Sequence, residues 1–257
     1  MFMEERQKEI LDTVNKMGRI SVLEIQDKYG ISGDSARRDL RILESRGLLK
    51  RTHGGAIKMM HRGTLPEDLY NPGDLTVTKE DYLAIAKKAI THIGEKDVIY
   101  LTTSLTGYYM ACSLPEDFPF TVVTNSVTNA NELRKHQNIS VILMGGEMSH
   151  RGHCHDCYTI QMMKTISLDK AFLTTTALSM EFGASYHSST GAEFLRTVMK
   201  QSAMNIGLYP SETVGRNSIY SICGVQEFDR IITDSGISED FVTQSQEMDI
   251  AIDVVPL

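Results

Sequence analysis

Apolar residues near the N-terminus recur with a helical period. Ile10, Leu11 and Val14 fall on one face of residues 3–17, charged residues fall on the other, and Gly18 follows. This pattern predicts an amphipathic first helix that ends at the glycine.

Two more helices follow at short intervals. Ser21 and Glu24 have the spacing of a capping box, in which the hydroxyl accepts an early amide and the carboxylate reaches back to the cap. They predict a second helix that runs to Gly30. Ser32 is a suitable N-cap for a third helix, which continues to Gly47.

The segment after the third helix has the pattern of a hairpin. Residues 48–51 and 56–59 are short and strand-like, and Gly54 and Gly55 lie between them. Glycine pairs favour tight turns between antiparallel strands. Residues 1–59 are therefore expected to form a small winged helix-turn-helix.

The rest of the chain alternates strand-like and helix-like segments. Residues 60–74 carry prolines and glycines without a sustained apolar period, which predicts a linker ahead of a larger domain at 75–257. Strands are predicted at Val98–Leu101, Thr121–Thr124, Val141–Met144, Ala171–Thr174, Ile231–Thr233 and Ile250–Val254. Helices are predicted around Ala130–His136, Gln161–Ile166 and Ala192–Met204. The alternation indicates an α/β domain with a mostly parallel sheet.

Charge separates the same two regions. The formal net charge is −7, but residues 1–62 carry 13 Lys and Arg against 9 Asp and Glu, while residues 63–257 carry 13 against 24. DNA phosphates repel an acidic body, so contact with nucleic acid is expected at the basic end.

Three observations bear on location. Residues 1–10 are charged, no apolar run approaches the ~20 residues of a membrane span, and the four cysteines lack the spacing of a small disulfide-rich domain. We expect a cytoplasmic protein with reduced thiols and no membrane partner.

The third predicted helix carries the strongest candidate for DNA contact. Ala36, Leu40 and Leu43 share one face, which leaves three arginines on the outer face. An arginine fork can bind a guanine edge or clamp a phosphate. The residues expected to contact double-stranded DNA are Ser21, Ser32, Gly33, Asp34, Ser35, Arg37, Arg38, Arg41, Arg51, His53 and Gly54.

Asp39 in the same helix has a different expected role. A carboxylate beside phosphate is unfavourable, so Asp39 is expected to hold an arginine in place. Three arginines alone would also suit a solvated basic helix face. Their combination with helix caps, three helical periods and a wing favours a recognition helix.

Together these residues resemble the DeoR family of transcription regulators. The likeness is carried by Arg6, Ile10, Val14, Ser32–Leu40, Leu43–Glu44, Gly47–Leu49 and Arg51–Ala56. Ser35 and Ala36 stand where Thr and an aliphatic residue are usual, which leaves the base preference open.

The resemblance implies a second domain that is similar in fold to ribose-phosphate isomerases and that binds a sugar phosphate without converting it. It continues more weakly over Val122–Ser126, Val141–Gly146, Asp169–Leu173, Glu193 and Ile231–Asp234. Independently, parallel sheets bind ligands at the carboxyl ends of their strands, where loop amides favour anions. The expected effector-binding residues are Thr102, Thr103, Ser104, Thr106, Asn125, Ser126, Gly145, Gly146 and Glu193.

Two departures from the family pattern bear on the ligand. Thr102–Thr106 replaces an Asp-x-Gly-Thr-Thr loop, and Pro210–Thr213 replaces an Asp-x-x-Lys segment. Thr213 thus stands in place of a lysine, and Glu212 brings a negative charge. Either the ligand is less anionic than a usual sugar phosphate, or the pocket has decayed. The first loop could also be a plain hydroxyl-rich helix cap.

A short histidine and cysteine cluster fits no family pattern. His153, Cys154, His155 and Cys157 offer zinc or redox ligands within a short span, but no second cysteine pair completes a finger-like site. They are weak metal candidates. The simpler interpretation is a polar loop near the ligand mouth, and no cofactor is expected.

The sequence predicts a DNA-binding transcription regulator, a repressor of a carbohydrate operon, that responds to a sugar phosphate or related metabolite. We expect a homodimer or homotetramer, because one small winged module buries little surface on DNA. One alternative is a thiol- or metal-responsive regulator that uses Cys154 and Cys157. Another is an isomerase-like enzyme with Glu193 as base, but the cationic group for such a reaction is missing. We therefore expect no enzyme activity.

Overall fold

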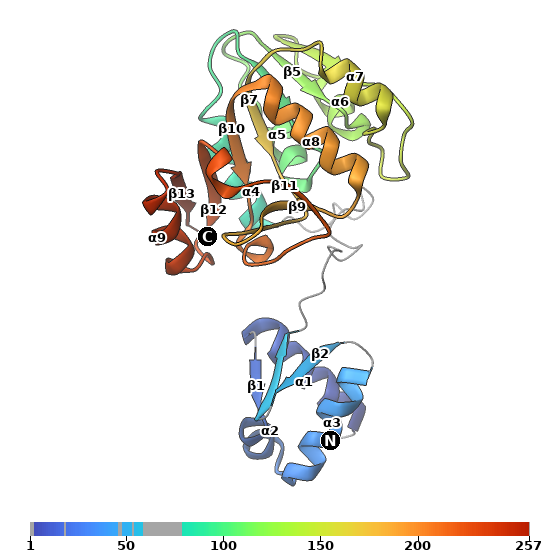
Figure 1. The fold of residues 1–257 in the computed structure, drawn as a ribbon, viewed down its shortest axis with the longest axis vertical. Helices are drawn as coiled ribbons and strands as arrows, with labels where there is room; N and C mark the ends of the chain where they lie inside the picture. The colour runs from blue at the N-terminus through green and yellow to red at the C-terminus, as the bar shows by residue number, and fades with distance from the viewer. Residues whose placement is uncertain (1–2, 18, 46–47, 53, 59–78, 257) are drawn as a thin grey trace. The chain divides into compact units, whose positions relative to one another are not determined.

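The chain divides into two compact units, Met1–His61 and Arg62–Leu257 (Figure 1). The computed structural model describes residues 3–17, 19–45, 48–52, 54–58 and 79–256. The linker predicted at 60–74, with both of its boundaries, lies outside the described residues.

The first unit contains the predicted helices and hairpin. Its elements are α1 (Met3–Met17), β1 (Arg19–Ser21), α2 (Val22–Tyr29), α3 (Gly33–Ser45), β2 (Leu49–Thr52) and β3 (Gly55–Lys58). The pattern missed β1, which pairs antiparallel with β3 to give a sheet in the order β1-β3-β2. The winged helix-turn-helix is confirmed.

Local sequence sets the boundaries of these helices. Ser21 accepts a hydrogen bond from the Glu24 amide, and the Glu24 carboxylate accepts from the Ser21 amide, so the predicted capping box is present. Gly30 ends α2 with a φ of 61°, a left-handed conformation that favours glycine. Gly55 is required by space, because a Cβ there would lie 2.1 Å from the Ile20 carbonyl oxygen.

The second unit is a three-layer α/β domain. Its helices are α4 (Glu80–Ile90), α5 (Leu105–Cys112), α6 (Val127–Leu133), α7 (Cys157–Met163), α8 (Ser189–Gln201) and α9 (Glu239–Glu247). Its strands are β4 (Val98–Leu101), β5 (Phe120–Thr124), β6 (Ile139–Leu143), β7 (Leu168–Leu173), β8 (Ala177–Ser179), β9 (Gly183–Tyr186), β10 (Ser202–Leu208), β11 (Tyr220–Cys223), β12 (Arg230–Asp234) and β13 (Ala251–Val255). Among the described residues, no helix is long and apolar enough to cross a membrane.

The described strands form a seven-stranded parallel sheet in the order β13-β12-β10-β7-β4-β5-β6. From β4 the chain builds outward through β5 to β6. It then returns to the other side of β4 with β7 and continues through β10 and β12 to β13. The winding direction therefore reverses between β4 and β7, which makes this a topological switch point.

Side chains on the two faces of the sheet enter two cores. Ile99 and Leu101 point to one face and pack in the same cluster as Ile85 of α4 and Met110 of α5. Tyr100 points to the other face and packs with α8, with its ring 5.9 Å from that of Phe194. This alternation is the pleat of a strand that is buried on both faces.

The predicted helix at Ala192–Met204 is wrong at its end. The helix stops at Gln201, and Ser202–Leu208 is β10, which pairs with β7 and β12 near the middle of the sheet. The pattern also missed α4, α5 and α9, and the small antiparallel sheet β11-β9-β8. That small sheet matters for function, because it supplies one wall of a cavity.

Candidate functional site

A cavity of about 350 Å³ lies at the switch point of the large sheet. Thr102–Ser104 follow β4, Asn125 follows β5 and Thr174–Thr176 follow β7, so three neighbouring strands direct their carboxyl ends to it. Its size and position are those of a small-molecule site in an open parallel sheet. The remaining lining residues are Tyr100, Ser149, His150, Arg151, His153, His155, Tyr186, His187, Gly191, Phe194 and Leu195.

One wall is the loop 149–155, which the end of β5 holds in place. The Asn125 side chain accepts from the Tyr100 hydroxyl at 2.9 Å and donates to the Cys154 carbonyl. The Cys154 amide donates to the Asn125 carbonyl at 3.0 Å, and the Val127 amide donates to the Gly152 carbonyl at 2.9 Å. These bonds fix the loop backbone, so the side chains it carries have defined positions.

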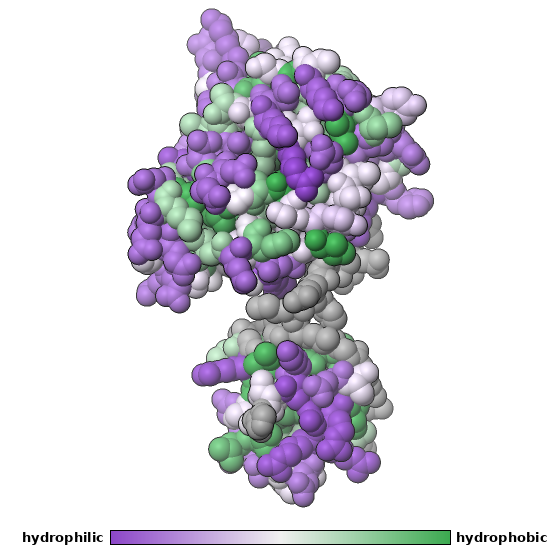
Figure 2. Space-filling model, viewed as in Figure 1, coloured by the Kyte–Doolittle hydropathy of each residue, from purple (hydrophilic) through white to green (hydrophobic). Residues whose placement is uncertain are grey.

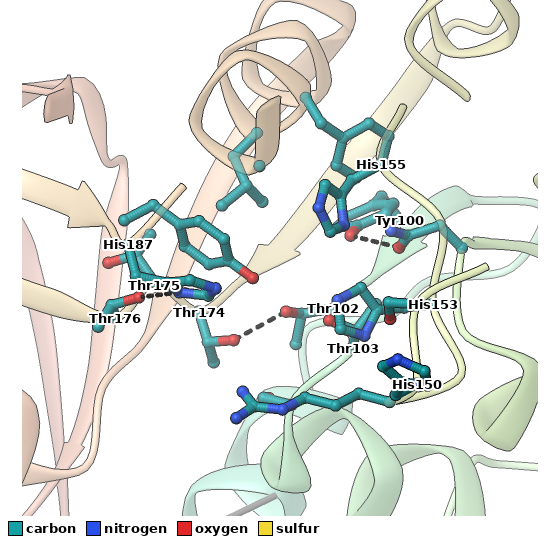
Figure 3. A pocket seen from close by; sticks show the side chains of 18 residues that line it. Tyr100, Thr102, Thr103, His150, His153, His155, Thr174, Thr175, Thr176 and His187 are labelled. Carbon is teal, nitrogen blue, oxygen red and sulfur yellow. Dashed lines mark hydrogen bonds between the residues drawn. The ribbon is translucent and has the colours of Figure 1, made fainter. Parts of the chain in front are cut away.

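Two histidines of this loop stack at the cavity. The rings of His153 and His155 lie 5.1 Å apart between centroids. Figure 3 shows both rings with Tyr100 on one side of the cavity and His187 with Thr176 on the other. A ring nitrogen of His187 lies 3.1 Å from the Thr176 hydroxyl, and the hydroxyls of Thr102 and Thr174 are 2.8 Å apart.

The cavity has an uneven charge balance. No aspartate, glutamate or lysine occurs among its described lining residues, and Arg151 supplies a permanent positive charge. Burial lowers the pKa of His153 to about 4, and the neighbouring His155 adds to the effect. Burial also lowers the pKa of His155 and of His187. Each of these shifts favours the neutral form of the ring at pH 7.

Four of the residues predicted to bind an effector line the cavity: Thr102, Thr103, Ser104 and Asn125. Ser104 also accepts a hydrogen bond from the Gly107 amide, so it caps α5 as the simpler interpretation of this loop supposed. The predicted residues that are not part of the lining are Thr106, Ser126, Gly145, Gly146 and Glu193.

Glu193 is the clearest correction. Gly191, Phe194 and Leu195 share the face of α8 that lines the cavity. Glu193 comes two residues after Gly191, which places it on the opposite face of the helix. Glu193 is exposed there and forms an ion pair with Arg196 at 3.0 Å. It cannot act as a base in this cavity.

Glu212 was expected to bring a negative charge to the phosphate site, but the structure places it outside the cavity lining. Its carboxylate accepts from the Tyr82 hydroxyl at 2.7 Å and pairs with Lys79 at 3.4 Å, and neither it nor Thr213 lines the cavity. The Thr213 hydroxyl donates to the Pro210 carbonyl. The charge balance of the cavity is instead set by the loop 149–155, which the resemblance did not cover.

The cysteines beside these histidines do not form a metal centre. Among the described residues, no group of three or more His, Cys, Asp or Glu side chains is placed to hold a metal ion. Cys154 is a buried free thiol whose pKa is raised by burial, which disfavours the reactive thiolate. Cys157 is a free, exposed residue at the start of α7. The loop that the sequence singled out for metal or redox chemistry instead lines the cavity with its histidines.

The first unit presents its arginines on α3. Ala36, Leu40 and Leu43 are buried in the core of this unit, and Arg37, Arg38 and Arg41 are exposed. Figure 2 shows hydrophilic side chains gathered over α3. Asp34 pairs with Arg37 at 3.2 Å on this surface, and the Ser32 and Ser35 hydroxyls are 3.1 Å apart.

Asp39 has the structural role that its chemistry suggested. Its buried carboxylate accepts hydrogen bonds from the Arg6 guanidinium at 2.7 Å and from the side-chain amide of Gln7 at 3.0 Å. These bonds connect α3 to α1. In the wing, Arg51 forms an ion pair with Glu44 of α3 at 3.1 Å. Gly54 accepts a hydrogen bond from the Val22 amide through its carbonyl. His53 lies outside the described residues.

Two family models match the two units. The model described as DeoR-like helix-turn-helix domain matches residues 6–61, and the model described as DeoR C terminal sensor domain matches residues 78–235. The chain belongs to the DeoR family. This DeoR-family protein has the DNA-binding domain of a transcriptional regulator, and its relatives carry the names of transcriptional regulators.

Those relatives match over nearly their whole length. The uncharacterized HTH-type transcriptional regulator YulB of Bacillus subtilis is 31% identical over 262 residues, which cover 100% of this chain and 98% of the relative. GlpR of Haloferax volcanii is 30% identical, with 92% of this chain and 91% of the relative covered. The transcriptional repressor GlcR of Bacillus subtilis is 30% identical, with 91% and 89% covered.

Solved structures show a more distant likeness. Ribose 5-phosphate isomerase A from Neisseria gonorrhoeae matches with a TM-score of 0.40 and 12% identity over 54% of this chain and 55% of that one. The isomerase from Methanocaldococcus jannaschii matches with a TM-score of 0.39 and 13% identity over 52% and 53%.

Proposed function

We propose that this regulator represses a carbohydrate-metabolism operon and that a sugar phosphate bound in the cavity changes its affinity for operator DNA. The observation that carries the proposal is the cavity at the switch point, lined by hydroxyls, imidazoles and Arg151 and, among described residues, by no carboxylate. Hydroxyls and imidazoles can hydrogen-bond sugar hydroxyls, and a cation without a competing carboxylate favours an anion.

The names of relatives support the operon class. They include a transcriptional repressor GlcR, a putative aga operon transcriptional repressor and an L-fucose operon activator. Because one of these relatives is named an activator, the experiment below measures whether the effector weakens or strengthens operator binding.

The proposed DNA contacts are those of a winged helix-turn-helix. The N-terminal turn of α3, with Gly33, Asp34 and Ser35, enters the major groove, and Arg37, Arg38 and Arg41 contact phosphates or base edges. The protein acts as at least a dimer, so its footprint contains two half-sites. Light scattering and footprinting test this assembly, and a monomer bound tightly to one half-site would contradict it.

The test of the function uses the full chain and DNA from upstream of its own gene. Fluorescence anisotropy measures operator binding while glucose 6-phosphate, fructose 6-phosphate and the free sugars are added in turn. We expect one phosphorylated sugar to change the affinity and to raise the unfolding temperature of the protein. If no sugar phosphate does either, and a chelator or an oxidant changes operator binding instead, the metal- or thiol-responsive alternative replaces the proposal.

A further inference from the structure

The loop 149–155 carries an arrangement that the proposed function alone does not explain. Arg151 is an exposed residue of the cavity lining, and its guanidinium forms no hydrogen bond or ion pair with any residue that the structure describes. Its charge reaches both walls, because it adds to burial in lowering the pKa of His153 on its own loop and of His187 on the opposite wall. A cation in this position favours an anion placed between the walls.

The imidazoles around it are held uncharged by their surroundings. His153 is buried and stacked on His155, so neither ring can be protonated without desolvation and mutual repulsion. His187 is held neutral by burial and by Arg151. An anion bound among them attracts the imidazolium charge and accepts hydrogen bonds from the protonated rings, which offsets the desolvation that otherwise keeps them neutral.

We propose that Arg151, His153 and His187 form the subsite for the anionic group of the effector, and that binding is coupled to uptake of a proton by the imidazole cluster. The inference rests on the proposed function for the identity of the ligand, a small polyhydroxylated metabolite with a phosphate group. The Thr102–Ser104 and Thr174–Thr176 loops then bind its hydroxyls.

Other charged and titratable groups around the rings are compatible with this assignment. Tyr100 from β4 and Tyr186 from β9 bring phenol groups to the lining, and His150 and Cys154 belong to the loop 149–155. Asp156, the N-cap of α7, raises the pKa of His155 and so favours protonation of that ring. The Asp156 carboxylate itself is stabilised by three backbone amides and the Thr159 hydroxyl, which lower its pKa to about 2. On α8, Glu193 and Arg196 pair with each other away from the lining.

The first test measures affinity. Calorimetry on the full chain compares glucose 6-phosphate, fructose 6-phosphate, inorganic phosphate and free glucose, with Arg151→Gln, Arg151→Lys and Arg134→Gln as variants. Arg134 is an exposed arginine at the end of α6 outside the cavity and serves as the matched control. We expect Arg151→Gln to weaken binding of the phosphorylated probe by about tenfold to a hundredfold, Arg151→Lys to recover part of it, and Arg134→Gln to have no effect.

The second test measures protons. The binding enthalpy is measured at pH 7 in buffers of different ionisation enthalpy, which gives the number of protons taken up. A phosphate group titrates with a pKa near 6, so glucose 6-sulfate, which does not titrate there, is used beside glucose 6-phosphate. We expect proton uptake with both probes, tighter binding as the pH falls from about 8 to about 6, and a smaller uptake in His153→Gln and His187→Gln.

The outcomes separate this inference from the proposed function. If a sugar phosphate binds and changes operator affinity, but Arg151→Gln binds it equally and no proton is taken up, the subsite is overturned and the function stands. If inorganic phosphate binds in an Arg151-dependent way with proton uptake, but no sugar phosphate alters operator binding, the function is overturned and the subsite stands. If no anion binds to the folded wild-type protein, both are overturned.

Discussion

The surface of α3 and the cavity of the second unit both use basic side chains, but they hold them in opposite states. Arg37, Arg38 and Arg41 are exposed, permanently charged and supported from below by an apolar face. In the cavity, His153 is buried and neutral, and the positive charge comes from Arg151. The α3 surface carries its full charge before it meets DNA, whereas the cavity carries the charge of Arg151 and, by our proposal, gains a proton on its imidazoles when an anion binds.

This difference predicts two different sensitivities. Exposed charges on DNA release counterions, so operator binding should depend steeply on salt and little on pH between about 6 and 8. Buried imidazoles exchange protons with solvent when an anion enters, so effector binding should depend on pH. Each region thus has its own experimental signature, and the following predictions test whether the two signatures stay separate.

The largest effect is expected for the arginines of α3. Replacing Arg37, Arg38 and Arg41 with alanine should weaken operator binding by roughly 1–3 kcal/mol for each arginine that reads a base. The slope of log affinity against log salt should become shallower by about 0.9 for each phosphate that the variant no longer neutralises. Anisotropy at several salt concentrations measures both, and Lys8→Ala on the exposed side of α1 is the control for each single arginine variant, because it also removes one positive charge. Unchanged affinity and slope in the triple variant would remove α3 from the interface.

A second prediction concerns the buried aspartate of α3. Asp39→Asn leaves Arg6 partly buried without its counter-charge, so the first unit should lose about 3–5 kcal/mol of unfolding free energy. The paired change Arg6→Met with Asp39→Leu should recover much of this loss, because no buried charge is left unpaired. Denaturant unfolding followed by circular dichroism checks it. A single variant as stable as the wild type would show that the pair is dispensable.

The third prediction concerns pH and the stability of the second unit. The pKa of His153 is lowered from 6.5 to about 4 on folding. Between pH 6.5 and about 4 the unfolded chain binds a proton at this ring and the folded chain does not. The free energy of unfolding therefore falls as the pH drops from 6.5 to about 4. The loss is on the order of 3 kcal/mol, and His155 and His187 shift in the same direction.

Thermal unfolding between about pH 7 and pH 5 measures this slope. His153→Gln should flatten it, because glutamine keeps hydrogen-bonding groups without taking up a proton. Saturation with a phosphorylated probe should flatten it too, since the bound anion raises the pKa of the cluster. A slope that is identical in wild type and variant would mean that His153 does not exchange its proton on unfolding.

Much of the first unit could be predicted because its signals are local. The capping box at Ser21 and Glu24, the left-handed Gly30 and the apolar face of α3 each lie within a few residues of what they determine. In the second unit, the strands β4, β5 and β7 were found from short apolar runs. The strand β10 was missed because SAMNIGL follows α8 without a break, and only pairing with β7 and β12 makes it a strand.

The cavity was predicted in part for the same reason. Thr102, Thr103, Ser104 and Asn125 were found because a general rule places ligands at the carboxyl ends of strands. Tyr186 and His187 were missed, because they reach the cavity only through the β8–β9 pairing, which no local pattern shows. Glu193 came from the family resemblance, and the helical position that turns it away from Gly191 could have excluded it.

The smallest effect is expected for Ser21, which could serve either as a DNA contact or as a helix cap. The sequence placed it among the DNA contacts, but its hydroxyl accepts the Glu24 amide in the cap of α2. Loss of such a cap costs about 1 kcal/mol, so Ser21→Ala should lower the stability of the first unit by that amount. Operator affinity measured well below the unfolding temperature should stay within about twofold, and Ser21→Asp, which preserves the cap, should restore the stability. If Ser21→Ala instead weakens operator binding tenfold without changing stability, its hydroxyl contacts DNA and the surface of α3 extends to the start of α2.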